Sequence, residues 1–112
     1  MNALRNKVQL IGFLGGDPDV RDLGEGKKLA RMRMATNETY KNQDGERITE
    51  TQWHSLIAWG KLAEIAEQIL SKGAEIVAEG KLVSRDFTDK EGNRRFITEV
   101  HLNELLLLRR KE

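Results

Sequence analysis

Residues 49–73, TETQWHSLIAWGKLAEIAEQILSKG, decide the fold because their hydrophobic period changes halfway. Glu50–Trp59 predicts a strand, and residues 61–71 predict a short helix whose apolar side chains recur three and four positions apart. The apolar side of that helix consists of Leu62, Ile65, Ala66, Ile69 and Leu70. Gly73 fits a glycine just past the helix C-terminus. The segment therefore predicts a strand that leads directly into one amphipathic helix.

Both tryptophans of the chain, Trp53 and Trp59, lie on this strand. Residues of equal parity share a face of a strand, so the two rings face the same way. Ser55 and Ile57 share their face, and His54, Leu56 and Ala58 form the other, which can cover a core. Tryptophan is costly to leave in water. The outward rings are therefore either a binding surface, or one core tryptophan and one at a subunit interface.

The rest of the chain predicts further strands on both sides of this segment. Residues 28–40 alternate, with Arg31 and Arg33 on one face and Met32 and Met34 on the other. The predicted strands are 7–14, 28–40, Glu50–Trp59, 74–85 and 96–108, with a strand tip at 20–23 and a bulge or bend at Gly80. Three strands, one helix and two strands match an all-β OB-fold, a five-stranded Greek-key barrel with the helix after the third strand. We expect one such domain over residues 1–112.

The composition limits the classes of protein that fit. Charged residues make up 33% of the 112 residues, and no apolar run approaches the ~20 residues of a membrane span. There is no cysteine, which excludes disulfides and thiolate metal sites and makes a reducing cytoplasm the default. The basic N-terminus has no apolar signal core, so no targeting peptide is expected.

The net charge of +1 is a weak indication of the partner, but its distribution is uneven. Residues 1–33 carry 7 basic and 4 acidic residues, residues 34–80 carry 4 and 8, and residues 81–112 carry 8 and 6. The two basic ends either converge into a basic track or form an ordinary solvated surface.

No catalytic or metal-binding pattern stands out. The chain has no GxSxG motif, and GFLGG lacks the GK[ST] ending of a phosphate-binding loop. His54 and His101 are far apart and lack metal-ligand spacing, so each is interpreted as a packed or interface histidine. We expect no enzyme activity, no catalytic residue, no metal and no cofactor.

Aromatic and basic residues are interleaved. Tyr40 and Phe87 each lie where a long strand gives way to a polar loop. Basic residues stand near the rings: Arg31, Arg33, Lys41, Lys61 and Arg85. Rings and cations along a groove suit single-stranded nucleic acid, because bases stack on the rings for ~1–3 kcal/mol each and cations neutralise phosphates.

Four segments of the sequence resemble a known family. VQLIGFLGGDPDVR, LARMRMATNETY, TQWHSLIAWGKLAEIAEQILSKG and VAEGKLVSRDFTDKEGNRRFITEV together resemble the DNA-binding domain of bacterial single-stranded DNA-binding proteins, from about Asn6 to Leu108. The resemblance implies an OB-fold homotetramer that wraps single-stranded DNA without sequence specificity. It further implies a place at the nucleoid, in replication, recombination and repair.

The resemblance also implies roles for individual residues. Tyr40, Trp53, Trp59 and Phe87 match its stacking aromatics, and His54 matches a histidine of the tetramer interface. Basic positions along the DNA path match Lys7, Arg21, Arg31, Arg33, Lys61, Lys72, Arg85 and Arg95. Asp86, beside Phe87, places a negative charge where a cation would help.

The chain departs from the family pattern at its end. It stops at LLLLRRKE, where family members usually continue into a Gly/Pro/Gln-rich linker and an acidic tip. Partners recruited through such a tip are therefore not expected. Two alternatives stay open: a primosomal-type accessory protein that acts through protein contacts, and an OB-fold nuclease.

Overall fold

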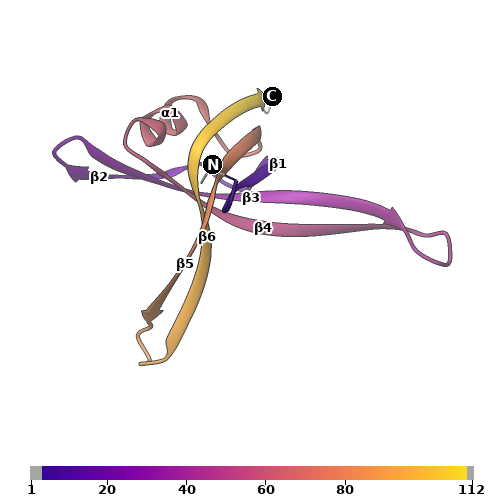
Figure 1. The fold of residues 1–112 in the computed structure, drawn as a ribbon. Coiled ribbons are helices and arrows are strands. Elements are labelled where there is room, and N and C mark those ends of the chain that lie inside the picture. The colour runs from indigo at the N-terminus through magenta and orange to yellow at the C-terminus, as the bar shows by residue number, and fades with distance from the viewer. Residues whose placement is uncertain (1–3, 111–112) are drawn as a thin grey trace.

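The computed structural model describes residues 4–110, which form one curved sheet and one helix. The elements are β1 (Val8–Leu14), β2 (Asp19–Gly24), β3 (Lys27–Lys41), β4 (Arg47–Trp59), α1 (Lys61–Ile69), β5 (Glu75–Thr88) and β6 (Arg94–Arg109). The strand order is β1-β5-β6-β4-β3-β2, and an additional β1–β3 pairing closes the sheet into a barrel (Figure 1). All neighbours are antiparallel except β4 and β6, which run parallel.

The closed barrel confirms the predicted OB-fold. β1 and β2 pair one after the other with β3, since Phe13 lies opposite Ala35 and Asp19 lies opposite Arg31. Together they act as one strand that is interrupted at residues 15–18, which gives the five strands expected. On that count the helix follows the third strand, as predicted; in the labels used here it follows β4, because residues 20–23 belong to the separately labelled strand β2.

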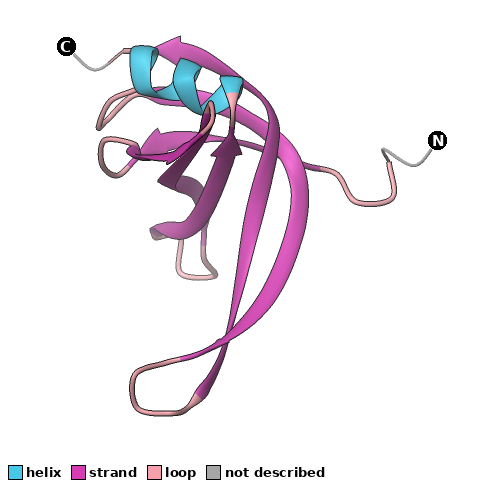
Figure 2. Ribbon diagram, turned by 90° about the vertical axis from the view of Figure 1, so that its left-hand side faces the viewer, coloured by secondary structure: helices cyan, strands magenta, loops and turns pink. Residues whose placement is uncertain are grey.

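The core lies inside the barrel, where the even-numbered residues of β3 meet those of the other strands. Met34, Leu56 and Ile76 are the largest side chains that are fully buried. The helix lies across the upper end of the strands, far from the tip of the β5–β6 hairpin (Figure 2). Ala63 and Ala66 are its fully buried residues, and their small side chains let the helix approach the barrel closely.

The end of the helix differs from the prediction. The helix stops at Ile69, with Leu70 as its C-cap, two residues before the predicted end. Gly73 lies beyond it in the turn to β5, at φ +87°, and its N–H donates to the Leu14 carbonyl at 2.9 Å. Ile65 is only half-buried and is not part of the core cluster. With 9 residues, this helix is too short to cross a membrane, and none of the described residues forms a helix that could.

Two glycines allow backbones to pass where no side chain would fit. A Cβ at Gly12 would come within 2.1 Å of the Ala35 carbonyl oxygen, next to the pairing that closes the barrel. A Cβ at Gly80 would come within 2.1 Å of the His101 carbonyl oxygen, at the bulge between β5 and β6. The bend predicted at Gly80 is therefore confirmed, and its cause is a close approach between two backbones.

Two hairpins extend beyond the barrel as long two-stranded arms (Figure 1). The β3–β4 arm is paired out to Lys41 and Arg47, and the β5–β6 arm out to Thr88 and Arg94. The radius of gyration, 16.1 Å, exceeds the roughly 13 Å expected for a compact chain of this length. β4, β5 and β6 are accordingly longer than predicted, because the hairpins stay paired outside the core.

The two arms end in turns of the same design. In one turn the Asn42 Oδ1 accepts N–H groups of Asp44 and Glu46, and in the other the Asp89 Oδ1 accepts those of Glu91 and Asn93. The fourth residue of each turn is a glycine with positive φ, +79° at Gly45 and +84° at Gly92. A side-chain acceptor and one glycine thus complete each turn locally.

We predict that Gly80→Ala lowers the free energy of unfolding by about 1–3 kcal/mol, because the added methyl group meets a carbonyl oxygen that belongs to rigid paired backbone. Urea unfolding at a fixed protein concentration measures the change. Gly16→Ala is the matched control, since a Cβ there meets nothing within 4 Å and the change should stay within about 0.5 kcal/mol. Equal stability of the two variants would contradict the role given to Gly80.

Candidate nucleic-acid interface

One lateral row of residues crosses five strands on the outside of the barrel. Asp19 of β2 lies opposite Arg31 of β3, which lies opposite Ile57 of β4. Ile57 pairs with His101 of β6, which in turn lies opposite Lys81 of β5. We call the surface that contains this row the outer face. It brings together segments from both ends of the chain. These ends are the two basic regions of the sequence, residues 1–33 and 81–112.

Trp53 and Trp59 both lie on the outer face, as their parity predicted. Their side chains are 52% and 50% exposed. Six residues of strand at ~3.3 Å each separate their Cα atoms by about 20 Å. Ile57 lies between them and is only 4% exposed, so it forms an apolar floor rather than a further contact. Leu29, which lies opposite Trp59, is buried in the same way.

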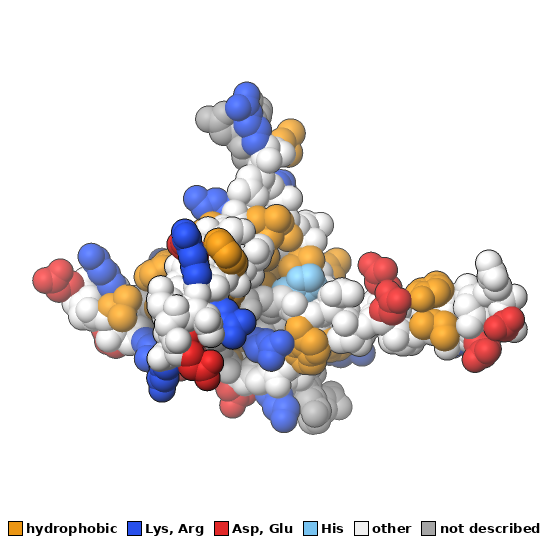
Figure 3. Space-filling view, turned by 90° about the horizontal axis from the view of Figure 1, so that it is seen from below, with side chains coloured by type: hydrophobic (Ala, Val, Ile, Leu, Met, Phe, Trp, Pro, Cys, Tyr) orange, Lys and Arg blue, Asp and Glu red, His pale blue; other side chains and the backbone are white. Residues whose placement is uncertain are grey.

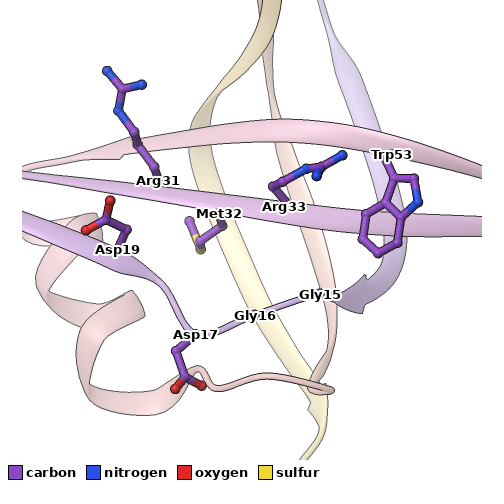
Figure 4. Close-up of a pocket in the computed structure, with 8 residues that line it drawn as sticks. All are labelled: Gly15, Gly16, Asp17, Asp19, Arg31, Met32, Arg33 and Trp53. Carbon is purple, nitrogen blue, oxygen red and sulfur yellow. The ribbon is translucent and has the colours of Figure 1, made fainter.

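Trp53 is held in place by its neighbours on β3 and in the loop after β1. A Cβ at Gly15 would come within 2.6 Å of the Trp53 Cζ3, so the ring lies directly on the Gly15 backbone. The Arg33 guanidinium lies 5.0 Å from the centre of the Trp53 ring (Figure 4). An open pocket of about 410 Å³ adjoins this ring and is lined also by Asp17 and Asp19. The tryptophan therefore stands half-exposed beside a hollow, with a cation above it.

The β5–β6 arm brings Phe87 and Arg85 to the same outer face. Both residues have the parity of Lys81, and Phe87 is 43% exposed. The Arg85 guanidinium lies 6.0 Å from the centre of the Phe87 ring. Asp86 lies on the opposite face of this arm and pairs with Arg94. The negative charge expected beside Phe87 is therefore turned away from the ring.

Tyr40 is not brought together with the other rings. In the β3–β4 register it lies opposite Ile48, on the face of the ribbon that carries His54, whereas Trp53 lies on the other face. Its hydroxyl donates to the Glu50 Oε1 at 3.0 Å, and this hydrogen bond raises the pKa of Tyr40. The outer part of this arm carries the acidic residues Glu38, Asp44, Glu46 and Glu50 against the basic residues Lys41 and Arg47. Seen from below, acidic side chains stand along this arm at the right, while Lys and Arg side chains gather over the body (Figure 3).

The remaining basic residues of the prediction are spread over the barrel and the β5–β6 arm, where Arg95 lies opposite Phe87. Arg21 lies opposite Leu29 on the outer face, 3.8 Å from Asp19, and Lys61 follows Trp59 by two residues at the start of α1. Lys72 lies in the turn after α1, where its backbone N–H donates to Asp17 at 2.7 Å. Lys7 pairs with Glu79 at 3.5 Å on the β1–β5 side. Arg95 pairs with Asp89 at 2.9 Å, and this hydrogen bond is the main reason that the pKa of Asp89 is lowered.

Lys81 and His101 belong to the outer face but were not predicted as members of it. The pairing of β4 with β6 that places them there is parallel and joins segments more than 40 residues apart. The parity of residues 96–108 could have placed His101 with Glu99 on one face. Nothing in the sequence indicated which strand would pair with this one and extend that face.

A second exposed surface is apolar and lies on β1, β5 and β6. Exposed side chains on it are Ile11, Phe13 and Leu106, and Val77 joins them because it lies opposite both Ile11 and Leu106. His54 lies elsewhere, on the core side of β4, where its Nε2 is 2.9 Å from the Thr36 Oγ1.

Comparison with known proteins finds a matching family and similar sequences. Residues 5–108 match the model of the single-strand binding protein family. The chain is 44% identical over 111 residues to Single-stranded DNA-binding protein 1 of Xylella fastidiosa, which covers 98% of this chain and 82% of that one. It is 39% identical over 108 residues to Single-stranded DNA-binding protein 1 of Chlorobaculum tepidum, which covers 96% of this chain and 67% of that one.

A solved structure described as a Plasmodium falciparum SSB complex with ssDNA matches this fold with a TM-score of 0.84 and 29% sequence identity. The match covers 92% of this chain and 94% of that chain. The family model covers nearly the whole chain and both relatives are more than 30% identical to it, so the chain belongs to the single-strand binding protein family.

Proposed function

We propose that this protein binds single-stranded DNA on its outer face, without sequence preference, and protects it during replication, recombination and repair at the nucleoid. The observation that carries the proposal is the pair of half-exposed tryptophans on one face, with Arg31 and Arg33 on the neighbouring strand. The relatives named single-stranded DNA-binding proteins and the structural neighbour described with ssDNA support it. They do not favour the alternative of a protein that acts through protein contacts alone.

The proposed mechanism divides the work between rings and cations. Trp53, Trp59 and Phe87 stack on bases, which gives affinity without reading sequence because every base has a flat face. Tyr40 is a fourth stacking platform. The bound DNA reaches it by passing to the other face of the β3–β4 arm. Phosphates are neutralised by basic residues of the outer face and its borders. These are Lys7, Arg21, Arg31, Arg33, Lys61, Lys72, Arg85 and Arg95.

We infer that the function is binding rather than catalysis, carried out by one domain over residues 1–112. The stacking rings and cations need no metal or cofactor to act. Among residues 4–110, no group of three His, Cys, Asp or Glu side chains lies close enough to hold a metal ion.

We further propose that the chain forms a homotetramer. The apolar surface of β1, β5 and β6 supports this, because Ile11, Phe13 and Leu106 are 55%, 43% and 59% exposed and form one patch with Val77. Patches of this kind mark surfaces where proteins associate. We also propose that His54, which lies outside this patch, takes part in a contact between subunits.

We predict that Trp53→Ala and Trp59→Ala each weaken binding of poly(dT) by roughly 1–3 kcal/mol, because each removes one stacking platform. Quenching of tryptophan fluorescence on titration with poly(dT) measures the affinity of the wild type. Titration with a labelled oligonucleotide measures the affinity of the variants. Phe96→Ala is the control, since this ring is 75% exposed but lies on the opposite face of its arm from Phe87. Absence of any quenching in the wild type at low salt would reject the proposed function.

We also predict that binding weakens with salt, and that Arg31→Gln makes the log–log slope less negative by about 0.7, the contribution of one neutralised phosphate. Arg109→Gln is the control, because this exposed arginine lies at the end of β6, next to Glu75 and away from the outer face. A slope that Arg31→Gln leaves unchanged would contradict the role of Arg31 as a phosphate ligand.

Sedimentation at micromolar concentration should show a tetramer, and Phe13→Glu should shift it towards smaller species, because the charge would be buried in an apolar contact. Leu23→Glu provides the control, as Leu23 is 54% exposed at the tip of the β2–β3 hairpin. A wild-type monomer at every concentration tested would be the contrary result.

A further inference from the structure

Glu99 is the one charged residue among residues 4–110 that is buried, at 3% exposure, and it lies on the outer face. Its parity on β6 is that of His101, and it lies opposite Val83 of β5. A carboxylate on a surface that binds phosphates repels the ligand, and its burial is unfavourable unless it is paired. Its presence at this position therefore requires partners that compensate its charge.

The two oxygens of Glu99 are occupied by two neighbouring side chains, Arg85 and His101. Arg85 donates from Nε to Oε1 at 3.1 Å and from Nη2 to Oε2 at 3.3 Å, and the His101 Nε2 lies 3.4 Å from Oε1. Burial alone would raise the pKa of Glu99, but the hydrogen bonds from Arg85 and His101 outweigh it and hold the pKa below its usual range. The carboxylate is therefore ionised at neutral pH and fixes the planar guanidinium in one orientation.

This pairing changes what Arg85 can do. Its positive charge is balanced by Glu99, and its guanidinium lies 6.0 Å from the centre of the Phe87 ring. Arg31 and Arg33 differ, because neither forms an ion pair with any of the described residues. Arg85 is therefore fixed between a carboxylate and a ring, whereas Arg31 is available to a phosphate.

We propose that Glu99 is a positioning residue of the nucleic-acid face: it holds Arg85 against Phe87, so that the ring is presented to a base in one fixed orientation. Arg85 then acts through Phe87 and is not itself a phosphate ligand. This inference rests on the proposed binding of single-stranded DNA, and it removes Arg85 from the phosphate-neutralising residues of the mechanism proposed above.

Glu99→Gln provides a test in which two explanations predict opposite changes in the affinity for poly(dT). The variant keeps the size of the side chain and removes a negative charge from the face, so charge alone predicts tighter binding of poly(dT). The positioning role predicts binding about fivefold weaker, the lower end of the loss for one stacked base. Glu104→Gln, an exposed carboxylate on the same strand, is the control and should leave binding unchanged.

The salt dependence and a double variant separate positioning from general damage to the fold. Arg85→Gln should weaken binding but leave the log–log salt slope at the wild-type value, whereas Arg31→Gln changes it by about 0.7. In a Phe87→Ala background, Glu99→Gln should cause no further loss, because the ring it positions is gone. If Glu99→Gln does not fold, Arg85→Lys replaces it, and it should weaken binding although the charge is kept.

Tighter or unchanged binding by Glu99→Gln, or wild-type binding by Arg85→Lys, overturns the inference. So does an Arg85→Gln variant with a reduced salt slope, which would restore Arg85 as a phosphate ligand. These results leave the proposed function intact, because they are read against a wild-type protein that binds poly(dT). A wild-type protein that shows no binding rejects the proposed function itself.

Discussion

The structure depends on two places where backbones pass each other without a side chain between them. Gly12 lets β1 approach β3 closely enough to close the barrel, and Gly80 lets β5 bend across β6. Closure fixes the strand order, and the strand order places β6 beside β4 in a parallel pairing. The row from Asp19 to Lys81 exists only because of that pairing. The candidate binding surface is therefore a consequence of how the barrel closes.

The net charge of +1 conceals a division of charge in space. Acidic residues predominate on the outer part of the β3–β4 arm, while Arg31, Arg33 and Lys81 lie on the outer face with two tryptophans. Even there the charges are not equivalent, since the guanidinium of Arg85 is matched by the buried Glu99. A count of basic residues would overestimate the cations available to phosphates.

The sequence predicted the fold, and the shared face of the two tryptophans in the candidate site, for a physical reason. The change of hydrophobic period between Trp59 and Lys61 and the alternation of residues 28–40 are local properties. They can be recognised without knowing which strands lie side by side. Parity placed Trp53 and Trp59 together correctly because they share one strand. Tyr40 has the parity of Met32 and Met34, so alternation along its strand turns it away from Arg31 and Arg33. The register with β4 was needed to show that this is also the face opposite to that of Trp53.

Other features could not be predicted because they depend on contacts between distant strands. Glu99 and Arg85 are on different strands, 14 residues apart, and no motif joins them. The helix ends at Ile69 rather than at residue 71 because Gly73 belongs to a turn held by Leu14. His101 reaches the outer face through a parallel neighbour. Long-range register decided each of these positions.

The matching turns at the ends of the two arms have a further consequence. Each is completed by hydrogen bonds among a few successive residues, from Asn42 to Glu46 in one arm and from Asp89 to Asn93 in the other. Neither turn draws on the barrel, so residues can be added to or removed from an arm at little cost to the core. The length of each arm, and with it the extent of the candidate binding surface, can therefore vary independently of the stability of the barrel that carries it.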